Sequence, residues 1–179
     1  ANEIVRRHVA PTVAQWISEE EPNVQPGVEG KKYQLAVDPL DGSSNVDLSL
    51  PTGTIFGISQ ADDTFLRPGR DSLVAAGYVL YSSCTELVLC LNHGVSIPLE
   101  TVGFVATSDS TGDLFRLCRP HMTCPVTGPY YSLNEAREPD WPEGLQRWVH
   151  DAKHGLLPSI PGTKLSSRYV CALVADVHR

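Results

Sequence analysis

The chain lacks the features that mark several large classes of protein. Its five cysteines are an odd number and none lies in a Cys-x-x-Cys pair, which argues against a disulfide framework or a structural zinc site. Reduced thiols favour the cytoplasm or an organelle matrix, such as that of a plastid or mitochondrion. No run of about 18 apolar residues could span a bilayer, and no signal peptide is evident. We therefore expect a soluble chain with no membrane insertion.

A surplus of basic residues is also absent, because the formal net charge is -7. A nucleic acid would meet a repulsive average field, so we expect no nucleic-acid partner. An anionic substrate would need metal ions or a local basic patch. The 179 residues, 41% of them hydrophobic, are enough for one domain with a proper core, or for one domain and part of a second.

The most informative stretch is Val37–Asn45 (VDPLDGSSN), which follows an apolar run. The run predicts a buried strand that ends at Asp38, because Pro39 cannot continue the hydrogen-bond ladder and the backbone must turn. Asp38 and Asp41, three residues apart, can then face one cation, and the carbonyl of Leu40 points the same way. Carboxylate and carbonyl oxygens are the ligands that Mg²⁺ prefers.

The second half of this stretch predicts a phosphate site. Gly42 lets the backbone approach a ligand closely, and Ser43 and Ser44 present hydroxyl and N–H groups where a short helix begins at Asn45. Helix starts of this kind bind phosphate. An ordinary Asp-Gly turn is the alternative interpretation, whereas an EF-hand is excluded because alternating Asp or Asn residues before the glycine and a distal Glu are missing.

An acidic run precedes this stretch. Residues 13–17 predict an extended segment that ends in Ser18-Glu19-Glu20-Glu21. If this strand end lies beside Asp38, one of Glu19 and Glu20 can be a metal ligand and the other a base for an attacking water. A solvated acidic turn is the alternative.

The remaining pattern predicts a mixed α/β fold of layered sheets and helices. Asp140 is the expected N-cap of a helix that ends before Gly155. A modest boundary near residue 128 separates a sheet-rich part, 1–128, from a more helical part, 129–179. The other expected elements are helices over 3–9 and 170–177 and strands over 33–37, 53–58, 72–80, 86–91, 95–99 and 112–117.

Five stretches together resemble the fructose-1,6-bisphosphatases, within the wider group of Mg²⁺-dependent sugar and inositol phosphatases. They are VDPLDGSSNVD (37–47), GTIFGI (53–58), LVAAGYVLY (73–81), YSLNE (131–135) and RYVCALVADVHR (168–179). The resemblance implies a sugar-phosphatase fold, with 1–128 as part of the N-terminal, allosteric-type domain and 129–179 as the start of the sugar-binding domain. Relative to the family pattern, we expect the chain to be incomplete at both ends.

Carried over by position, the resemblance implies a role for each of a set of residues. The metal ligands are Glu19, Asp38, Leu40 through its carbonyl, and Asp41; Glu20 helps to activate water; Gly42, Ser43 and Ser44 hold the phosphate being cleaved, with Asn45 adjoining; Asn134 and Tyr169 bind the other phosphate; and Arg168 reaches a neighbouring subunit. The implied cofactor is two or three Mg²⁺ ions, with Mn²⁺ or Zn²⁺ as alternatives. Taken alone, Arg168 would be assigned to a surface salt bridge.

The departures limit what the resemblance implies. Arg137 stands where many members have a substrate-contacting tyrosine, and residues 97–127 do not follow the family pattern. The segment 59–69 is short and has no cysteine, which argues against the redox-regulatory loop of plastid members.

The resulting hypothesis is an enzyme that hydrolyses the 1-phosphate of fructose 1,6-bisphosphate in sugar metabolism, as a homodimer or homotetramer. Three alternatives stay open at this point. The chain is a non-catalytic subunit whose apolar faces are covered by protein partners, a piece of a longer enzyme, or a sedoheptulose 1,7-bisphosphatase.

Overall fold

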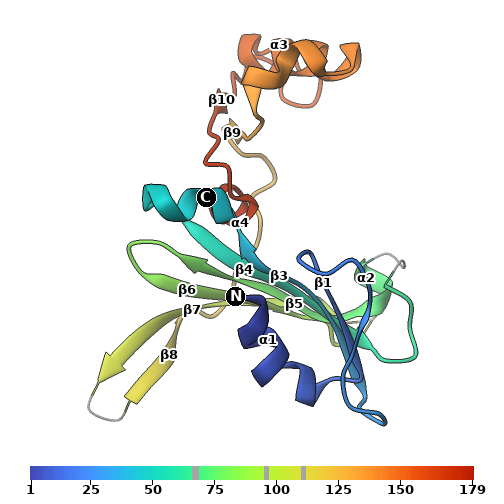
Figure 1. Cartoon of the computed structure of the whole chain (residues 1–179). Helices are drawn as coiled ribbons and strands as arrows, with labels where there is room; N and C mark the ends of the chain where they lie inside the picture. The colour runs from blue at the N-terminus through green and yellow to red at the C-terminus, as the bar shows by residue number, and fades with distance from the viewer. Residues whose placement is uncertain (66–68, 95–96, 110–111) are drawn as a thin grey trace.

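The computed structural model describes residues 1–65, 69–94, 97–109 and 112–179. They are organised around one eight-stranded sheet in the order β2-β1-β3-β4-β5-β6-β7-β8 (Figure 1). Only β1 and β3 pair in parallel within it, and the other neighbours are antiparallel. This arrangement confirms the mixed α/β class that the sequence predicts.

The strands of the large sheet are β1 (Gln15–Ser18), β2 (Gln25–Pro26), β3 (Tyr33–Asp41), β4 (Thr52–Gln60), β5 (Leu73–Tyr81), β6 (Thr85–Leu91), β7 (Glu100–Asp109) and β8 (Gly112–Arg119). A small parallel pair is formed by β9 (Tyr130–Tyr131) and β10 (Ser166–Ser167). The α-helices are α1 (Asn2–His8), α2 (Gly69–Ser72), α3 (Glu143–His154) and α4 (Leu173–His178). The 3₁₀-helices are η1 (Ala10–Thr12), η2 (Ser43–Leu48) and η3 (Glu135–Asp140).

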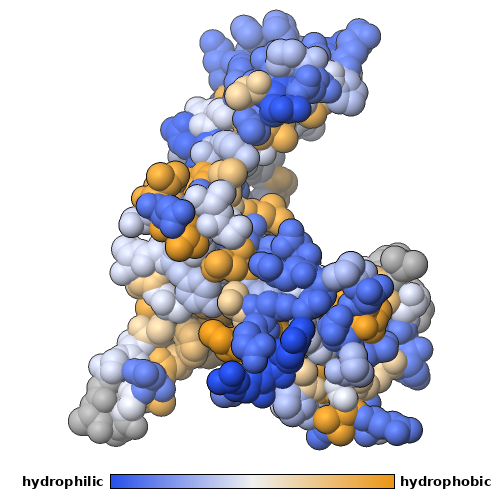
Figure 2. Space-filling model, viewed as in Figure 1, coloured by the Kyte–Doolittle hydropathy of each residue, from blue (hydrophilic) through white to orange (hydrophobic). Residues whose placement is uncertain are grey.

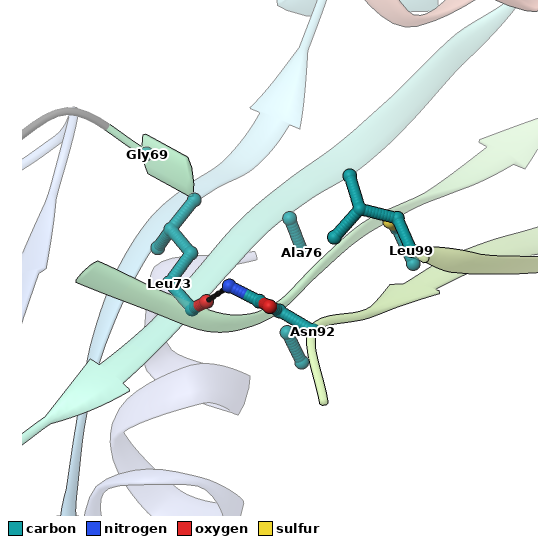
Figure 3. A pocket seen from close by; sticks show the side chains of 7 residues that line it. Gly69, Leu73, Ala76, Asn92 and Leu99 are labelled. Carbon is teal, nitrogen blue, oxygen red and sulfur yellow. Dashed lines mark hydrogen bonds between the residues drawn. The ribbon is translucent and has the colours of Figure 1, made fainter. Parts of the chain in front are cut away.

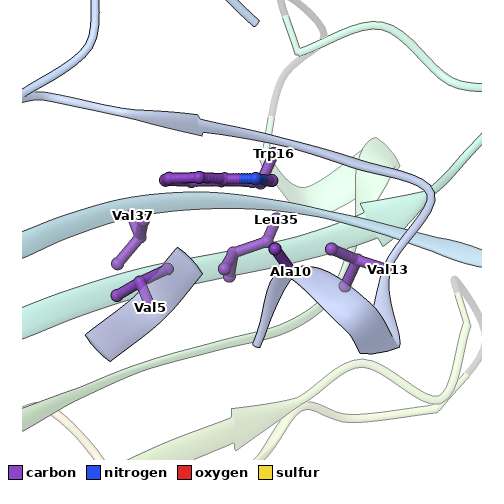
Figure 4. Packing of buried hydrophobic residues seen from close by; sticks show 6 residues of the cluster. All are labelled: Val5, Ala10, Val13, Trp16, Leu35 and Val37. Carbon is purple, nitrogen blue, oxygen red and sulfur yellow. The ribbon is translucent and has the colours of Figure 1, made fainter. Parts of the chain in front are cut away.

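One face of the sheet is covered at the β1 and β3 end by the N-terminal helices. Figure 4 shows the apolar residues of α1 and its continuation packed against the strands. Trp16 is the most buried of them at 1% exposure. Full burial of one aliphatic side chain contributes about 1.5–3 kcal/mol, so this cluster fixes α1 on the sheet. Its members are Val5, Ala10, Val13, Trp16, Leu35 and Val37.

The opposite face carries α4, which comes from the far end of the sequence (Figure 1). Its Val174 packs with Ala172 against Leu80 of β5, and Ile55 and Tyr78 complete the cluster. The approach is close, because a Cβ on Gly53 of β4 would lie 2.6 Å from a methyl carbon of Val174. The C-terminal segment therefore packs directly on the strands that follow the VDPLDGSSN stretch.

The segment with α3 extends away from the sheet in Figure 1. Val149 and Ala152 are the buried residues of α3, and Trp148 meets Tyr131 edge to face at 6.0 Å between ring centroids. A hydrogen bond from the Tyr131 hydroxyl to Glu135 (2.6 Å) and the Lys153–Glu135 ion pair (2.5 Å) join β9 to α3. These two donors lower the pKa of Glu135 to about 2.

Most expected elements are confirmed within a residue or two, and five differ. The helix expected over 170–177 is α4, which begins three residues later, at Leu173. Pro39 does not end β3, which continues to Asp41 through a β-bulge between Asp38 and Asp41. The helix expected at Asn45 is the 3₁₀-helix η2, which begins at Ser43. Asp140 is not the N-cap of α3, because Pro142 holds that position. Of the strand expected over 95–99, residues 95–96 lie outside the described residues and 97–99 are not strand, whereas β7 was not expected.

Among the helices that the structure describes, none combines the length and the apolar character needed to cross a lipid bilayer.

Candidate metal and phosphate site

The parallel pairing of β1 and β3 brings two acidic segments together. Ser18 pairs with Val37, and the Glu19 N–H donates to the Val37 carbonyl at 3.1 Å. Glu19, the first residue after β1, therefore lies at the same level of the sheet as Asp38 on β3. The sequence-based expectation that the two strand ends lie side by side is met by this register.

A β-bulge in β3 decides where the two aspartates point. In a regular strand, residues three apart lie on opposite faces. Here the pairing with β4 passes from Asp38↔Ile55 to Asp41↔Gly53, so that two residues of β3 lie opposite Thr54 alone. The extra residue restores the alternation, and Asp38 and Asp41 share one face of the sheet. The Thr54 hydroxyl holds the bulge by donating to the Pro39 carbonyl at 3.0 Å.

The charges of this edge repel one another. Burial raises the pKa of Asp38, a hydrogen bond from the Leu40 N–H (3.0 Å) opposes that rise, and the negative charges of Asp41 and Glu20 add to it. We call Glu19, Glu20, Asp38 and Asp41 the acidic edge. No described Lys, Arg or His forms an ion pair with any of the four. An uncompensated group of carboxylates of this kind favours a bound cation.

The acidic edge is not gathered into a finished ligand set. In the part of the chain that the structure describes, no three His, Cys, Asp or Glu side chains are placed together to hold a metal ion. Glu19 and Glu20 are exposed at the turn after β1. Glu21 points elsewhere, because its carboxylate accepts hydrogen bonds from Asn2 (2.9 Å) and Arg6 (2.7 Å) of α1. The oxygen donors of the acidic edge therefore fit Mg²⁺. To complete the coordination of the ion, these side chains would have to rotate or further ligands would have to be added.

The loop that follows, residues 42–45 (the GSSN loop), is shaped by contact with the C-terminal segment. Gly42 has a φ of 74°, which favours glycine, and a Cβ there would lie 2.6 Å from the Cβ of Ala172. The glycine is required both for the turn and for this close approach. Ser43 and Ser44 at the start of η2 are exposed.

Asn45 is buried at 3% exposure and ties the loop to two other segments. Its side-chain amide donates to the carbonyls of Pro51 (3.0 Å) and Val170 (2.8 Å). The Nδ2 atom is thereby occupied, so the structure gives Asn45 a positioning role next to the loop. Its expected contact with substrate remains a prediction.

Asp41 is held by α4. The Val174 N–H in the first turn of that helix donates to the Asp41 Oδ2 at 2.6 Å. A carboxylate at a helix N-terminus accepts an otherwise unpaired N–H and is stabilised by the helix dipole. The same segment is braced from within, because Asp176 accepts a hydrogen bond from the Val170 N–H at 3.2 Å. Residues 170–176 thus contact both Asp41, at the end of the bulge, and Asn45, at the end of the GSSN loop.

The other end of α4 is anchored by a polar cluster on the same sheet face. His178 hydrogen-bonds the Tyr78 hydroxyl through Nδ1 at 3.1 Å and lies 3.6 Å from Glu86 through Nε2. Glu86 is also ion-paired with Arg119 of β8. Sequence reasoning assigned no role to this cluster, because its members come from four separate elements.

Of the three residues expected to bind the second phosphate or a neighbouring subunit, two lie in the segment directly before α4. Arg168 lies over the Tyr130 ring at 5.1 Å, and Tyr169 donates to the Cys171 sulfur at 3.4 Å. Both line cavities beside α4, of about 270 and 470 Å³, which share Ser132 and Asp176. Asn134 is exposed at the start of η3 and lines neither cavity.

Arg179 is a residue that sequence reasoning missed. It lines the smaller cavity together with Arg168, so two cationic side chains face the same 270 Å³ space. The sequence did offer a signal for Arg179, because it is the last residue of the RYVCALVADVHR stretch that carries the family resemblance. Its pairing with Arg168 became visible only once α4 was placed.

A cavity of about 170 Å³ opens on the sheet between Gly69 and Leu99 (Figure 3). Its walls are mainly apolar, among them Leu73, Ala76 and Leu99, and the amide of Asn92 donates to the Leu73 carbonyl at 2.8 Å. It offers no nucleophile beside a base and no carboxylate. The acidic edge and the GSSN loop therefore remain the candidate site.

The chain is similar to known proteins in both sequence and fold. The family model described as "Fructose-1-6-bisphosphatase, N-terminal domain" matches residues 2–105. The chain is 44% identical over 156 residues to the class 1 fructose-1,6-bisphosphatase of Sorangium cellulosum, with 83% of this chain and 42% of the relative covered. It is 39% identical over 168 residues to the cytosolic fructose-1,6-bisphosphatase of Oryza sativa subsp. indica, with 90% and 46% covered.

The fold comparison extends over almost the whole chain. The holo-form crystal structure of Leishmania major fructose-1,6-bisphosphatase aligns with a TM-score of 0.81 at 30% identity, covering 99% of this chain and 56% of that one. The chain spans about half the length of the curated relatives it matches. The sequence match, the matched fold and the bulge with its acidic edge lead to one conclusion: the chain belongs to the fructose-1,6-bisphosphatase family.

Proposed function

We propose that this chain carries the metal and phosphate half of an active site that hydrolyses the 1-phosphate of fructose 1,6-bisphosphate. The observation that carries the proposal is the β3 bulge, which turns Asp38 and Asp41 to one face beside Glu19 and directly before the GSSN loop. The relatives named fructose-1,6-bisphosphatase supply the substrate.

Each group has a proposed task. Asp38, Asp41, Glu19 and the Leu40 carbonyl would hold Mg²⁺, which when bound neutralises phosphoryl charge and acidifies water. Glu20 would accept the proton of the attacking water. The N–H and hydroxyl groups of the exposed Ser43 and Ser44, with the Gly42 backbone, would hold the phosphoryl group in line for attack.

For the second phosphate and the assembly, the proposal rests on residues on either side of α4. Arg168 and Arg179 on one cavity would supply the positive charge that a distal phosphate needs, and Tyr169 on the next cavity would add a hydroxyl donor. We propose that Asn134 completes this site and that Arg168 also serves a neighbouring subunit in a homo-oligomer. We further propose that residues 1–128 and 129–179 belong to two domains, and that the protein acts in the cytoplasm or an organelle matrix.

The test is Mg²⁺-dependent release of inorganic phosphate from fructose 1,6-bisphosphate by the 179-residue chain. Wild type should release phosphate, Asp38→Asn should lose at least about two orders of magnitude, as expected when a charge-stabilising group is removed, and Glu29→Gln, an exposed acid away from the edge, should match wild type. Equal rates in wild type and Asp38→Asn, or no release by wild type, would contradict the proposal for this chain.

A second candidate is a non-catalytic subunit of a larger assembly. It would explain apolar side chains that the described part of the chain leaves exposed. Apolar side chains exposed at η2 and just after it, Val46, Leu48 and Leu50, would suit a partner surface, and Figure 2 shows apolar colour over η2. A monodisperse homo-oligomer that releases phosphate would reject this candidate.

A further inference from the structure

Two histidines lie one turn apart on the exposed side of α3, far along the chain from the acidic edge. His150 and His154 are at positions i and i+4, and their rings stack with centroids 4.3 Å apart at an interplanar angle of 25°. Side chains at this spacing lie one above the other on a helix. The surface of α3 is largely hydrophilic in Figure 2, so both rings meet solvent.

The hydrogen bonds of the two rings fix which nitrogen is available. His154 Nδ1 lies 2.7 Å from the His150 carbonyl, and His150 Nδ1 lies 3.1 Å from Asp151 Oδ1. A carbonyl and a carboxylate can only accept, so both Nδ1 atoms must donate. In the neutral rings the lone pair is then on Nε2, and no described residue hydrogen-bonds either Nε2. Metal-binding histidines in proteins are held in this way by an oxygen acceptor on the other nitrogen.

The surrounding charges favour a cation. Both rings lie in the second half of α3, where the helix dipole is negative, and Asp151 adds a carboxylate. The Arg and the Lys of α3 are already paired, Arg147 with Glu143 at 2.6 Å and Lys153 with Glu135 at 2.5 Å. Neither would oppose an ion at the histidines with an uncompensated charge.

We propose that His150 and His154 form a two-histidine site for a divalent transition metal such as Ni²⁺, Zn²⁺ or Cu²⁺. Imidazole nitrogen suits these ions, whereas Mg²⁺ prefers carboxylate oxygen and belongs to the acidic edge. Metal–nitrogen distances of about 2.0–2.1 Å require the two Nε2 atoms to be roughly 3–3.5 Å apart. The two rings would have to rotate out of the stacked arrangement to reach this separation, and water would complete the coordination.

The experiment is a calorimetric titration of the 179-residue chain with Ni²⁺. Wild type should bind one ion at least tenfold more tightly than His150→Gln or His154→Gln, since each variant retains a single imidazole. His93→Gln is the matched control, because His93 is exposed and paired only with Glu100 (3.1 Å). It should bind like wild type. Unchanged thermal midpoints without metal verify that the variants fold.

The double variant Asp38→Asn/Asp41→Asn should also bind Ni²⁺ like wild type, which separates this site from the proposed active site. Ring ¹⁵N signals of His150 and His154 should shift at Nε2 on metal addition. Equal Ni²⁺ affinity in wild type and His154→Gln would overturn the proposal, as would a loss of affinity confined to His93→Gln or to the aspartate variant.

Discussion

Replacing Gly42 by alanine should destabilise the fold by about 2–5 kcal/mol. The residue has a φ of 74°, and the left-handed conformation costs an L-residue roughly 1–2 kcal/mol. The added Cβ would lie 2.6 Å from the Ala172 Cβ, well inside the roughly 3.5–4.0 Å of a comfortable carbon contact. Overpacking of this kind costs about 1–3 kcal/mol. The sum is a large part of the roughly 5–15 kcal/mol that stabilises a domain.

Gly30→Ala provides the matched control. Gly30 has a φ of 81°, and a Cβ there would meet nothing within 4 Å. It should therefore show the backbone cost alone, and the difference between the two variants measures the contact with Ala172. Urea unfolding followed by circular dichroism gives both values.

A second variant tests the contact itself. Gly42→Ala combined with Ala172→Gly removes the clashing methyl group, so the pair should recover most of the overpacking cost and show a coupling energy of about 1–3 kcal/mol. If Gly42→Ala costs no more than Gly30→Ala, or if the coupling is absent, the GSSN loop is not shaped by the C-terminal segment and the reasoning fails.

Three further perturbations test the same arrangement. Metal-free Asp38→Asn should be more stable than wild type near pH 7 and equal to it well below the ordinary pKa of 3.8, because the folded pKa of Asp38 is raised and its ionised form costs stability that protonation removes. Urea titrations at the two pH values check this. Asn45→Ala should lose about 1–3 kcal/mol for each of the two carbonyls it leaves unpaired, measured by urea unfolding. Glu86→Gln should lower the free energy of unfolding by about 1.5–3 kcal/mol and increase the rate of amide hydrogen exchange in α4. Glu100→Gln, which removes the exposed pair with His93, should lower the free energy of unfolding by less than about 1 kcal/mol.

The sequence predicted the elements around the acidic edge well, because apolar periodicity and turn residues are local signals. The helix at 3–9 and the strands at 33–37, 53–58, 72–80 and 86–91 were all found. β7 was missed because the pattern from residue 104 onward is less readable and the expected strand was placed over 95–99. The N-cap of α3 was misplaced because Pro142, with its fixed φ, occupies the cap position instead of Asp140.

The site itself was predicted by residue type and not by geometry. The sequence indicated that Asp38 and Asp41 could face one ion, but assigned this to a turn. The structure uses a bulge, whose extra residue depends on pairing with β4 and cannot be inferred from β3 alone. The hydrogen bond from Val174 to Asp41 joins residues 133 positions apart, and no local pattern reports such a contact.

The central claim is that Asp38 and Asp41 form a divalent-cation site. Its most direct test is a Mn²⁺ titration, followed by electron paramagnetic resonance, in a His150→Gln/His154→Gln background that removes α3 as a competing site. The parent should bind Mn²⁺ and should release it when Mg²⁺ is added in excess, and Asp38→Asn or Asp41→Asn should reduce Mn²⁺ affinity at least tenfold. Mn²⁺ affinity that is unchanged in both aspartate variants would contradict the account.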